Sequence, residues 1–132
     1  MKISIITTTF NSAATVRDTL ESVRSQTHPD VEHIIVDGRS ADGTLAVVAG
    51  FPHVARVLSE RDKGVYDAMN KGIGLATGEV IGILNSDDIY VDPSVLSGIA
   101  RAFEDPAVMT VYADLQYVHP DDTGKIKRTW IT

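Results

Sequence analysis

Short, almost uninterrupted apolar runs alternate along this chain with longer segments of helical periodicity. The clearest runs lie at residues 3–6, 33–36 and 80–84. Strands that are apolar at nearly every position are typical of parallel sheets, because helices cover both faces of such sheets. The alternation of strands with helical segments indicates an α/β domain. We therefore expect a mostly parallel sheet flanked by helices, with right-handed crossovers between its strands.

The other elements follow from apolar spacing and from helix-start signals. Weaker strands are predicted at residues 55–58 and 108–112, and helices at residues 13–24, 42–49, 65–76 and 93–103. Asn11 and Ser12 offer an N-cap for the first helix. In the third helix one apolar stripe, which we interpret as core contacts, comprises Tyr66, Met69, Ile73 and Ala76.

Length and composition restrict the classes of function. The 132 residues fit a single domain over residues 1–132. With 12 basic and 18 acidic residues the net charge is −6, which argues against binding to nucleic acid. Because the chain has no Cys, disulfides, thiolate metal sites and Cys nucleophiles are excluded. No signal-peptide pattern and no apolar stretch of membrane-spanning length is seen, so we expect a cytoplasmic protein.

Polar side chains gather in the loops that follow the predicted strands. Ligands of parallel α/β sheets bind beyond the carboxyl ends of the strands, and this rule selects residues 7–12, 37–43, 61–64 and 85–88. In the last of these loops, Asp87 and Asp88 are adjacent carboxylates that repel each other. A divalent cation such as Mg²⁺ or Mn²⁺ would relieve that repulsion. The alternative is a solvated turn that one of the two Asp side chains caps.

Two more loops carry candidate ligand-binding groups. Asp37 ends the second strand, where it could accept a hydrogen bond from a base N–H or a ribose hydroxyl, whereas Asp42 is better interpreted as a helix cap. Lys63 precedes a helix N-terminus and would form an anion site with it, unless it is only a solvated cation. The polar face of that helix, which would either line the same cleft or merely face water, comprises Asp67, Asn70 and Lys71.

From about Met1 to Tyr112, and with its motifs in a single alignment along the chain, the sequence resembles the family 2 glycosyltransferases with the GT-A fold. The matching stretches are 5–11 (IITTTFN), 25–27 (SQT), 34–38 (IIVDG), 40–44 (SADGT) and 59–72 (SERDKGVYDAMNKG), and 85–88 (NSDD) is similar to the D-x-D-type metal motif. The branch that assembles exopolysaccharide, colanic acid and lipopolysaccharide repeat units looks most similar. The resemblance implies a Rossmann-like fold and metal-dependent, inverting transfer of a sugar from a UDP-sugar to a saccharide or lipid-linked acceptor.

The resemblance also implies roles for single residues. Thr8 and Phe10 would hold uracil, and Asp37 would help to read the base. Lys63 would lie near the base or the diphosphate. A second group of roles concerns the cation: Asp87 would contact the ribose or the metal, and Asp88 would ligate Mn²⁺ or Mg²⁺. The full set of nucleotide-binding positions that the resemblance implies is Thr7, Thr8, Phe10, Asp37, Gly38, Asp62, Lys63, Asn70 and Asp87.

Several features depart from the family pattern. Many members carry a second acid, which contacts uracil N3, at the position of Gly38. Arg39 stands where a small residue is common and Arg61 where proline is common; either could contact phosphate or be plain surface. Family members usually continue well beyond the metal motif, whereas only 44 residues follow Asp88. We therefore expect a truncated chain or a donor-binding half, whose catalytic base lies beyond Thr132, with Asp114 as a weaker candidate.

Two other functions stay open from the sequence. A Mg²⁺-dependent phospho-acceptor signalling module has a similar size and an acidic pair, but it needs that pair after the first strand and a Lys after the fifth. Here residues 7–9 (TTT) and 114–115 (DL) occupy those places. A fragment that binds UDP without catalysis is the other alternative. The sequence also leaves open the oligomeric state and peripheral membrane association of the full-length enzyme.

Overall fold

The computed structural model describes residues 1–119 and 121–130, and within them the main feature is a parallel sheet of four strands. The strands are β1 (Ile3–Thr9), β2 (Val31–Asp37), β3 (Val54–Ser59) and β4 (Val80–Ile83), in the order β3-β2-β1-β4. The helices that connect or follow them are α1 (Val16–Arg24), α2 (Thr44–Ala49), α3 (Val65–Leu75) and α4 (Val95–Ala102). The predicted α/β class with a mostly parallel sheet is confirmed.

The chain divides into two compact units, Met1–Ala100 and Arg101–Thr132. The first unit contains the parallel sheet, and the second contains an antiparallel pair, β5 (Leu115–His119) and β6 (Asp122–Trp130). The single domain expected over residues 1–132 stays a prediction. None of the helices in the described part of the chain has both the length and the apolar character that a membrane span needs.

The predicted strand at residues 108–112 is wrong. These residues are irregular, and Met109 and Tyr112 are among the most exposed apolar side chains of the described chain. An apolar run forms a strand only where a neighbouring backbone accepts its hydrogen bonds, and the ladder instead forms further along, between β5 and β6. The apolar pattern does not predict this antiparallel pair, because polar residues and turn formers interrupt its few apolar side chains.

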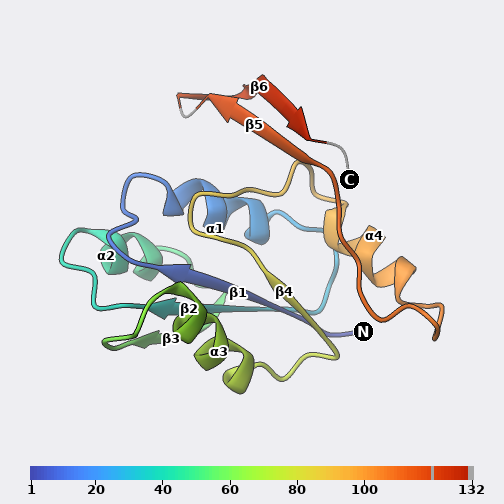
Figure 1. Cartoon of the computed structure of the whole chain (residues 1–132), viewed down its shortest axis with the longest axis horizontal. Helices are drawn as coiled ribbons and strands as arrows, with labels where there is room; N and C mark the ends of the chain where they lie inside the picture. Colours follow the sequence, from blue (N-terminus) through green and yellow to red (C-terminus); the bar gives the residue numbers. More distant parts are fainter. Residues whose placement is uncertain (120, 131–132) are drawn as a thin grey trace. The chain divides into compact units, whose positions relative to one another are not determined.

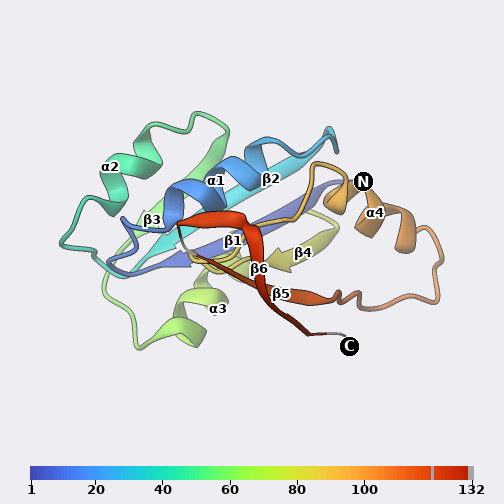
Figure 2. The same cartoon turned by 90° about the horizontal axis from the view of Figure 1, so that it is seen from above.

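β1 and β2 are buried on both faces, as their apolar runs predict. Ile3 and Ile5 face α1 and α4, in a cluster that includes Val23 and Leu96. Side chains of α1, β2 and α2 form a neighbouring cluster on the same face. Ile6 points the other way, toward α3. Alternate side chains of a strand thus meet helices on opposite faces, with α1 and α2 on one side and α3 on the other (Figure 1, Figure 2).

α3 approaches the sheet through its small residues. The buried positions of this helix are Ala68 and Gly72, and a Cβ atom at Gly72 would overlap Cγ2 of Ile6. The predicted core stripe is therefore wrong for Tyr66 and Ile73, which are 78% and 45% exposed. The small side chains decide which face of the helix meets the sheet, because only they permit so close an approach.

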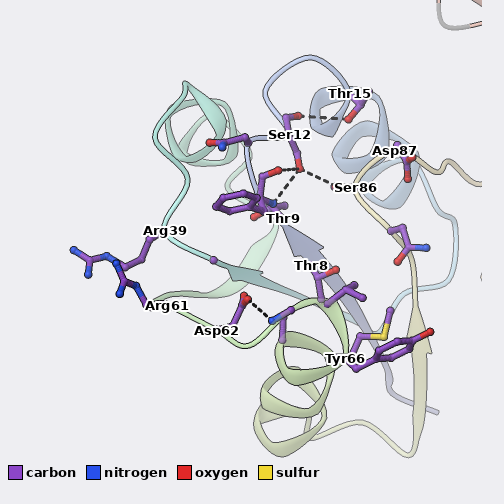
Figure 3. Close-up of a pocket in the computed structure, with 18 residues that line it drawn as sticks. Thr8, Thr9, Ser12, Thr15, Arg39, Arg61, Asp62, Tyr66, Ser86 and Asp87 are labelled. Atoms are coloured by element: carbon purple, nitrogen blue, oxygen red, sulfur yellow. Dashed lines mark hydrogen bonds between the residues drawn. The ribbon is translucent and has the colours of Figure 1, made fainter.

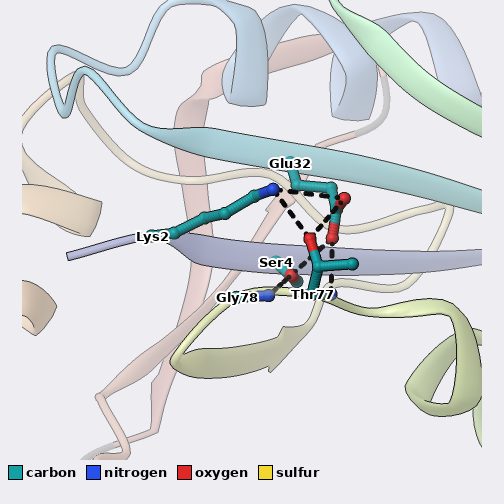
Figure 4. Close-up of polar contacts among 5 residues, drawn as sticks. All are labelled: Lys2, Ser4, Glu32, Thr77 and Gly78. Atoms are coloured by element: carbon teal, nitrogen blue, oxygen red, sulfur yellow. Dashed lines mark hydrogen bonds and ion pairs between the residues drawn. The ribbon is translucent and has the colours of Figure 1, made fainter.

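At the amino ends of β1 and β2, a polar cluster closes the sheet around the buried carboxylate of Glu32 (Figure 4). Glu32 accepts hydrogen bonds from the Ser4 hydroxyl at 2.7 Å and from the N–H and hydroxyl of Thr77, both at 2.9 Å. Lys2 Nζ lies 3.5 Å from Glu32 Oε2. Burial raises the pKa of Glu32, but the hydrogen bonds from Thr77 and Ser4 and the charge of Lys2 outweigh it and lower the pKa to about 2.

Replacement of Glu32 by Gln should weaken the fold and change its response to acid. The native state holds Glu32 ionised down to about pH 2, whereas the unfolded chain takes up the proton near the ordinary value of 4.5. The stability that the carboxylate supplies is thus present above pH 4.5 and is lost as the pH falls toward 2. We expect Glu32→Gln to lower the free energy of unfolding at pH 7 by about 2–3 kcal/mol.

Urea unfolding between pH 2 and 7 measures both effects, with Glu79→Gln as the control because Glu79 is an exposed acid nearby. In Glu32→Gln the loss of stability between pH 4.5 and 2 should be reduced. An unchanged pH dependence in this variant would contradict the role given to the carboxylate.

Two glycines of α3 should respond in opposite directions to replacement by Ala. Gly72→Ala places a methyl group against Ile6 and should destabilise the protein by about 1–3 kcal/mol. Gly74 is exposed in the same helix, and a Cβ atom there would have no neighbour within 4 Å, so Gly74→Ala should stabilise by about 0.5–1 kcal/mol. Chemical denaturation of the two variants checks this, and equal stabilisation by both would refute the close approach of α3 to β1.

Candidate functional site

A cleft lies at the carboxyl ends of the parallel strands, within the first unit (Figure 3). Its lining comes from the β1–α1 loop, the β2–α2 loop, the β3–α3 loop with the first turns of α3, and the β4–α4 loop. β1 pairs with β2 on one side and with β4 on the other. The strand order therefore changes direction between β1 and β4, because β2 and β3 lie on one side of β1 and β4 lies on the other. Ligands of open α/β sheets bind at such a switch point.

The β1–α1 loop is longer than the sequence suggests. α1 begins at Val16 with Thr15 as its N-cap, so the N-cap predicted at Asn11 and Ser12 is wrong. The Ser12 carbonyl accepts the N–H of Val16 at 2.9 Å, which forms an extra turn before the helix. The Ser12 hydroxyl does not cap α1, since it lies 2.9 Å from the Ser86 hydroxyl and 3.2 Å from the Phe10 nitrogen.

Hydrogen bonds join this loop to the β2–α2 loop. The Asn11 N–H donates to the Ser40 hydroxyl at 2.8 Å, and the Asn11 side-chain oxygen accepts the N–H of Ala41 at 2.9 Å. The Ser12 N–H donates to the Thr44 hydroxyl at 2.8 Å. The predicted cap role of Asp42 is wrong, because Gly43 is the N-cap of α2. The Asp42 carboxylate instead accepts the N–H of Thr44 at 3.0 Å and the N–H of Ala13 at 3.1 Å, so it joins the two loops.

Asp37 is fully buried where β2 ends, and its carboxylate holds three segments together. Oδ1 accepts the hydroxyls of Thr9 at 2.7 Å and Ser40 at 2.5 Å. Oδ2 accepts the Ser40 N–H at 2.9 Å and the Ser59 hydroxyl at 2.8 Å. Burial raises the pKa of Asp37, but the hydrogen bonds from Ser40, Thr9 and Ser59 outweigh it and hold the pKa below its usual value.

This geometry gives Asp37 a structural role in place of the predicted contact with a base. A carboxylate has about four lone-pair sites, and four donors within the protein already occupy those of Asp37. The side chain does not line the cleft. Its effect on a ligand is therefore indirect, through the loop that it fixes.

Two residues of the cleft have strained backbones. Asn11 and Arg39 have φ angles of 51° and 62°, and no other non-glycine residue in the described part of the chain has a positive φ. L residues rarely adopt this left-handed region, and such strain gathers at binding sites where the surrounding structure enforces it. Around Arg39 the backbone is held by the two hydrogen bonds that Ser40 donates to the Asp37 carboxylate.

The β3–α3 loop brings Asp62 into the cleft but not Lys63. Asp62 Oδ1 accepts the N–H of Gly64 at 3.0 Å, and Gly64 adopts a φ of 111° that favours glycine. α3 begins directly afterwards, at Val65, as predicted. The Lys63 side chain is exposed, and its backbone N–H donates to Asp67 Oδ2 at 2.9 Å.

The structure thus brings together some of the predicted site residues and separates others. Those that line the cleft are Thr8, Phe10, Gly38, Asp62 and Asp87, and those that do not are Thr7, Asp37, Lys63, Asn70 and Asp88. Thr7 is buried on the face of β1 opposite to that of Thr8, with its hydroxyl 2.9 Å from Nε2 of His33. Asp114 belongs to the second unit, and the base position predicted beyond Thr132 lies outside the described residues.

The acidic pair sits on a tight turn after β4. The Asp88 N–H donates to the Asn85 carbonyl at 3.0 Å, and the Thr19 hydroxyl donates to the Asp88 carbonyl at 2.7 Å. Burial and, after it, the negative charge of Asp87 raise the pKa of Asp88. Among the described residues no group of three or more His, Asp or Glu side chains is placed to hold a metal ion, so a cation at this pair would need further ligands.

Other lining residues were not predicted as site residues. Tyr66 and Met69 line the cleft although their helical spacing suggested core positions, because the spacing shows a common face without showing what that face meets. Arg39 and Arg61, for which the sequence allows either a phosphate contact or plain surface, also line it. Figure 3 shows both arginines on the side of the cleft opposite Asp87.

Comparisons with known proteins agree with this architecture. A structure of S. aureus TarS in complex with UDP-GlcNAc is similar with a TM-score of 0.73 and 28% identity, over 80% of this chain and 32% of that chain. A structure of the mannosyltransferase PcManGT from Pyrobaculum calidifontis in complex with GDP-Man and Mn²⁺ is similar with a TM-score of 0.75 and 25% identity, over 93% of this chain and 37% of that chain. The expected GT-A fold is confirmed.

Sequence comparisons give the family. An uncharacterized glycosyltransferase of Mycobacterium tuberculosis is 39% identical over 102 residues, which are 76% of this chain and 39% of that protein. The chain spans about two fifths of the length of the curated relatives that it matches. Residues 4–131 match the family described as glycosyl transferase family 2. Since this match covers nearly the whole chain, the protein belongs to glycosyl transferase family 2.

Proposed function

We propose that this chain is the donor-binding part of a glycosyltransferase that transfers a sugar from a UDP-sugar to a saccharide or lipid-linked acceptor. The observation that carries the proposal is a single cleft, at the switch point of the sheet, lined by both an exposed aromatic ring and a carboxylate of the acidic pair. Phe10 supplies the ring and is 66% exposed, and Asp87 supplies the carboxylate. The cleft, of about 1250 Å³, has room for a nucleoside joined to a second group.

The nucleoside would lie against the ring of Phe10. An aromatic face offers a stacking surface to any base, and burying so exposed a ring on binding is favourable. Thr8, which lies near the end of β1 and two residues before Phe10 in the sequence, lines the same cleft. The roles of Lys63 and Asn70 in holding the nucleotide stay predictions, because neither side chain lines the cleft.

A divalent cation would lie at Asp87 and Asp88. Hard carboxylate oxygens are ligands that Mg²⁺ and Mn²⁺ prefer, and a cation bound with a nucleotide usually takes only one or two protein carboxylates beside water and phosphate oxygens. The adjacent carboxylates of Asp87 and Asp88 would supply these protein ligands. When bound, the ion would neutralise the negative charge of the diphosphate as it departs. Because the chain carries a net charge of −6, an anionic donor would otherwise be repelled.

The rest of the reaction concerns the acceptor. A general base would remove the proton of the acceptor hydroxyl as that oxygen attacks the anomeric carbon opposite the leaving diphosphate, with inversion. Asp114 stays a weak candidate for this base.

Family membership disfavours the phospho-acceptor alternative, while a fragment that binds donor without catalysis would differ from the proposed enzyme in a transfer assay. The cytoplasmic location and the role in polysaccharide assembly stay predictions.

Isothermal titration of UDP with and without Mn²⁺ tests the proposal. We expect Mn²⁺ to strengthen UDP binding, and the double variant Asp87→Asn with Asp88→Asn to lose this gain while keeping its metal-free affinity. Loss of charge-assisted contacts of this kind changes affinity by about tenfold or more. Asp18→Asn is the matched control, since Asp18 is an exposed acid of α1 that does not line the cleft.

The proposed function would be contradicted by a wild-type protein that does not bind UDP under either condition. UDP binding that is the same with and without Mn²⁺, and unchanged in the double variant, would contradict the metal site alone.

A further inference from the structure

Gly38 makes room in the cleft for the carboxylate of a neighbouring loop. A Cβ atom at position 38 would lie 2.7 Å from Asp62 Oδ2 and 3.4 Å from Cδ2 of Phe10. The first distance is too short for a real side chain, so any residue with a Cβ would displace the carboxylate. The lack of a side chain at position 38 therefore lets the β3–α3 loop place a carboxylate oxygen close to the aromatic ring.

That oxygen is available as an acceptor. Asp62 Oδ1 accepts the N–H of Gly64 at 3.0 Å, while the described residues show no hydrogen bond at Oδ2. Asp62 is half-buried and takes part in none of the ion pairs of the described chain. A half-buried carboxylate oxygen that faces a cleft is best satisfied by an N–H donor from a ligand.

The two arginines that line the same cleft have the opposite chemistry. Arg39 and Arg61 carry only N–H donors, so they match acceptor oxygens. A ring that satisfies both kinds of group has an N–H next to carbonyl oxygens. Uracil has this arrangement, whereas the corresponding ring nitrogen of cytosine has no hydrogen and is an acceptor.

We propose that Asp62 Oδ2 selects the nucleobase by accepting a hydrogen bond from a ring N–H, which favours uracil over cytosine beside Phe10. This inference rests on the proposed function, because it assumes that a nucleotide occupies the cleft. Gly38 is a positioning residue in this arrangement: it contributes space, and its own backbone need not touch the base.

Titration of UDP and of CDP in the presence of Mn²⁺ tests the inference. Wild-type protein should prefer UDP by about tenfold or more, the usual effect of one charge-assisted hydrogen bond. In Asp62→Asn the amide oxygen can keep the bond to Gly64, and the NH₂ group then replaces Oδ2 with a donor. The preference should therefore shift toward CDP by about tenfold or more. Asp18→Asn makes the same chemical change away from the cleft and should leave the preference unchanged.

A second variant moves the carboxylate without changing its chemistry. Gly38→Ala should push Oδ2 away from its present place and weaken the preference for UDP, while its melting temperature shows that the protein is folded. Equal binding of UDP and CDP by wild type, or an unchanged preference in folded Asp62→Asn, would overturn the inference and leave the proposed function intact. A wild-type protein that binds neither nucleotide would overturn the proposed function itself.

Discussion

The buried carboxylate of Asp37 is the interaction on which the cleft depends. It bonds to Thr9 at the end of β1, to Ser40 in the β2–α2 loop and to Ser59 at the end of β3. The ends of three neighbouring strands are thereby fixed at one point. Loops that start from fixed ends can hold strained residues such as Arg39 in place, which free loops could not.

The two ends of the sheet differ because their buried carboxylates have different neighbours. At the amino end, Glu32 joins β1 and β2 to the α3–β4 connection, and the hydrogen bonds of the cluster close the surface there. At the carboxyl end, protein donors already occupy the carboxylate of Asp37, and the loops that follow the strands line the cleft. On the α3 side, the small residues Ala68 and Gly72 allow the helix to pack closely against β1, and Tyr66 and Met69 line the cleft.

Much of this arrangement could be predicted from the sequence because it rests on local patterns. The continuous apolar runs at residues 3–6 and 33–36 predict buried parallel strands, and the strand-end rule then selects the loops that line the cleft. What could not be predicted depends on contacts between distant segments. The four donors around Asp37 come from three segments, so the sequence alone could not show that this acid is already satisfied. The close approach of Gly38 and Asp62 joins residues from two loops, and a helical stripe such as Tyr66 and Met69 does not reveal what it faces.

The contact between Ser12 and Ser86 links the two halves of the cleft. Their hydroxyl oxygens lie 2.9 Å apart, and the Phe10 nitrogen lies 3.2 Å from the same Ser12 hydroxyl. Ser86 directly precedes Asp87, so the aromatic side and the acidic side share one small polar bridge. Thermodynamic linkage then requires that any effect of an occupant at Phe10 on affinity at the acidic pair be matched by an equal effect in the reverse direction. Whatever coupling this bridge transmits is therefore reciprocal, and the order in which two ligands bind does not alter their total binding free energy.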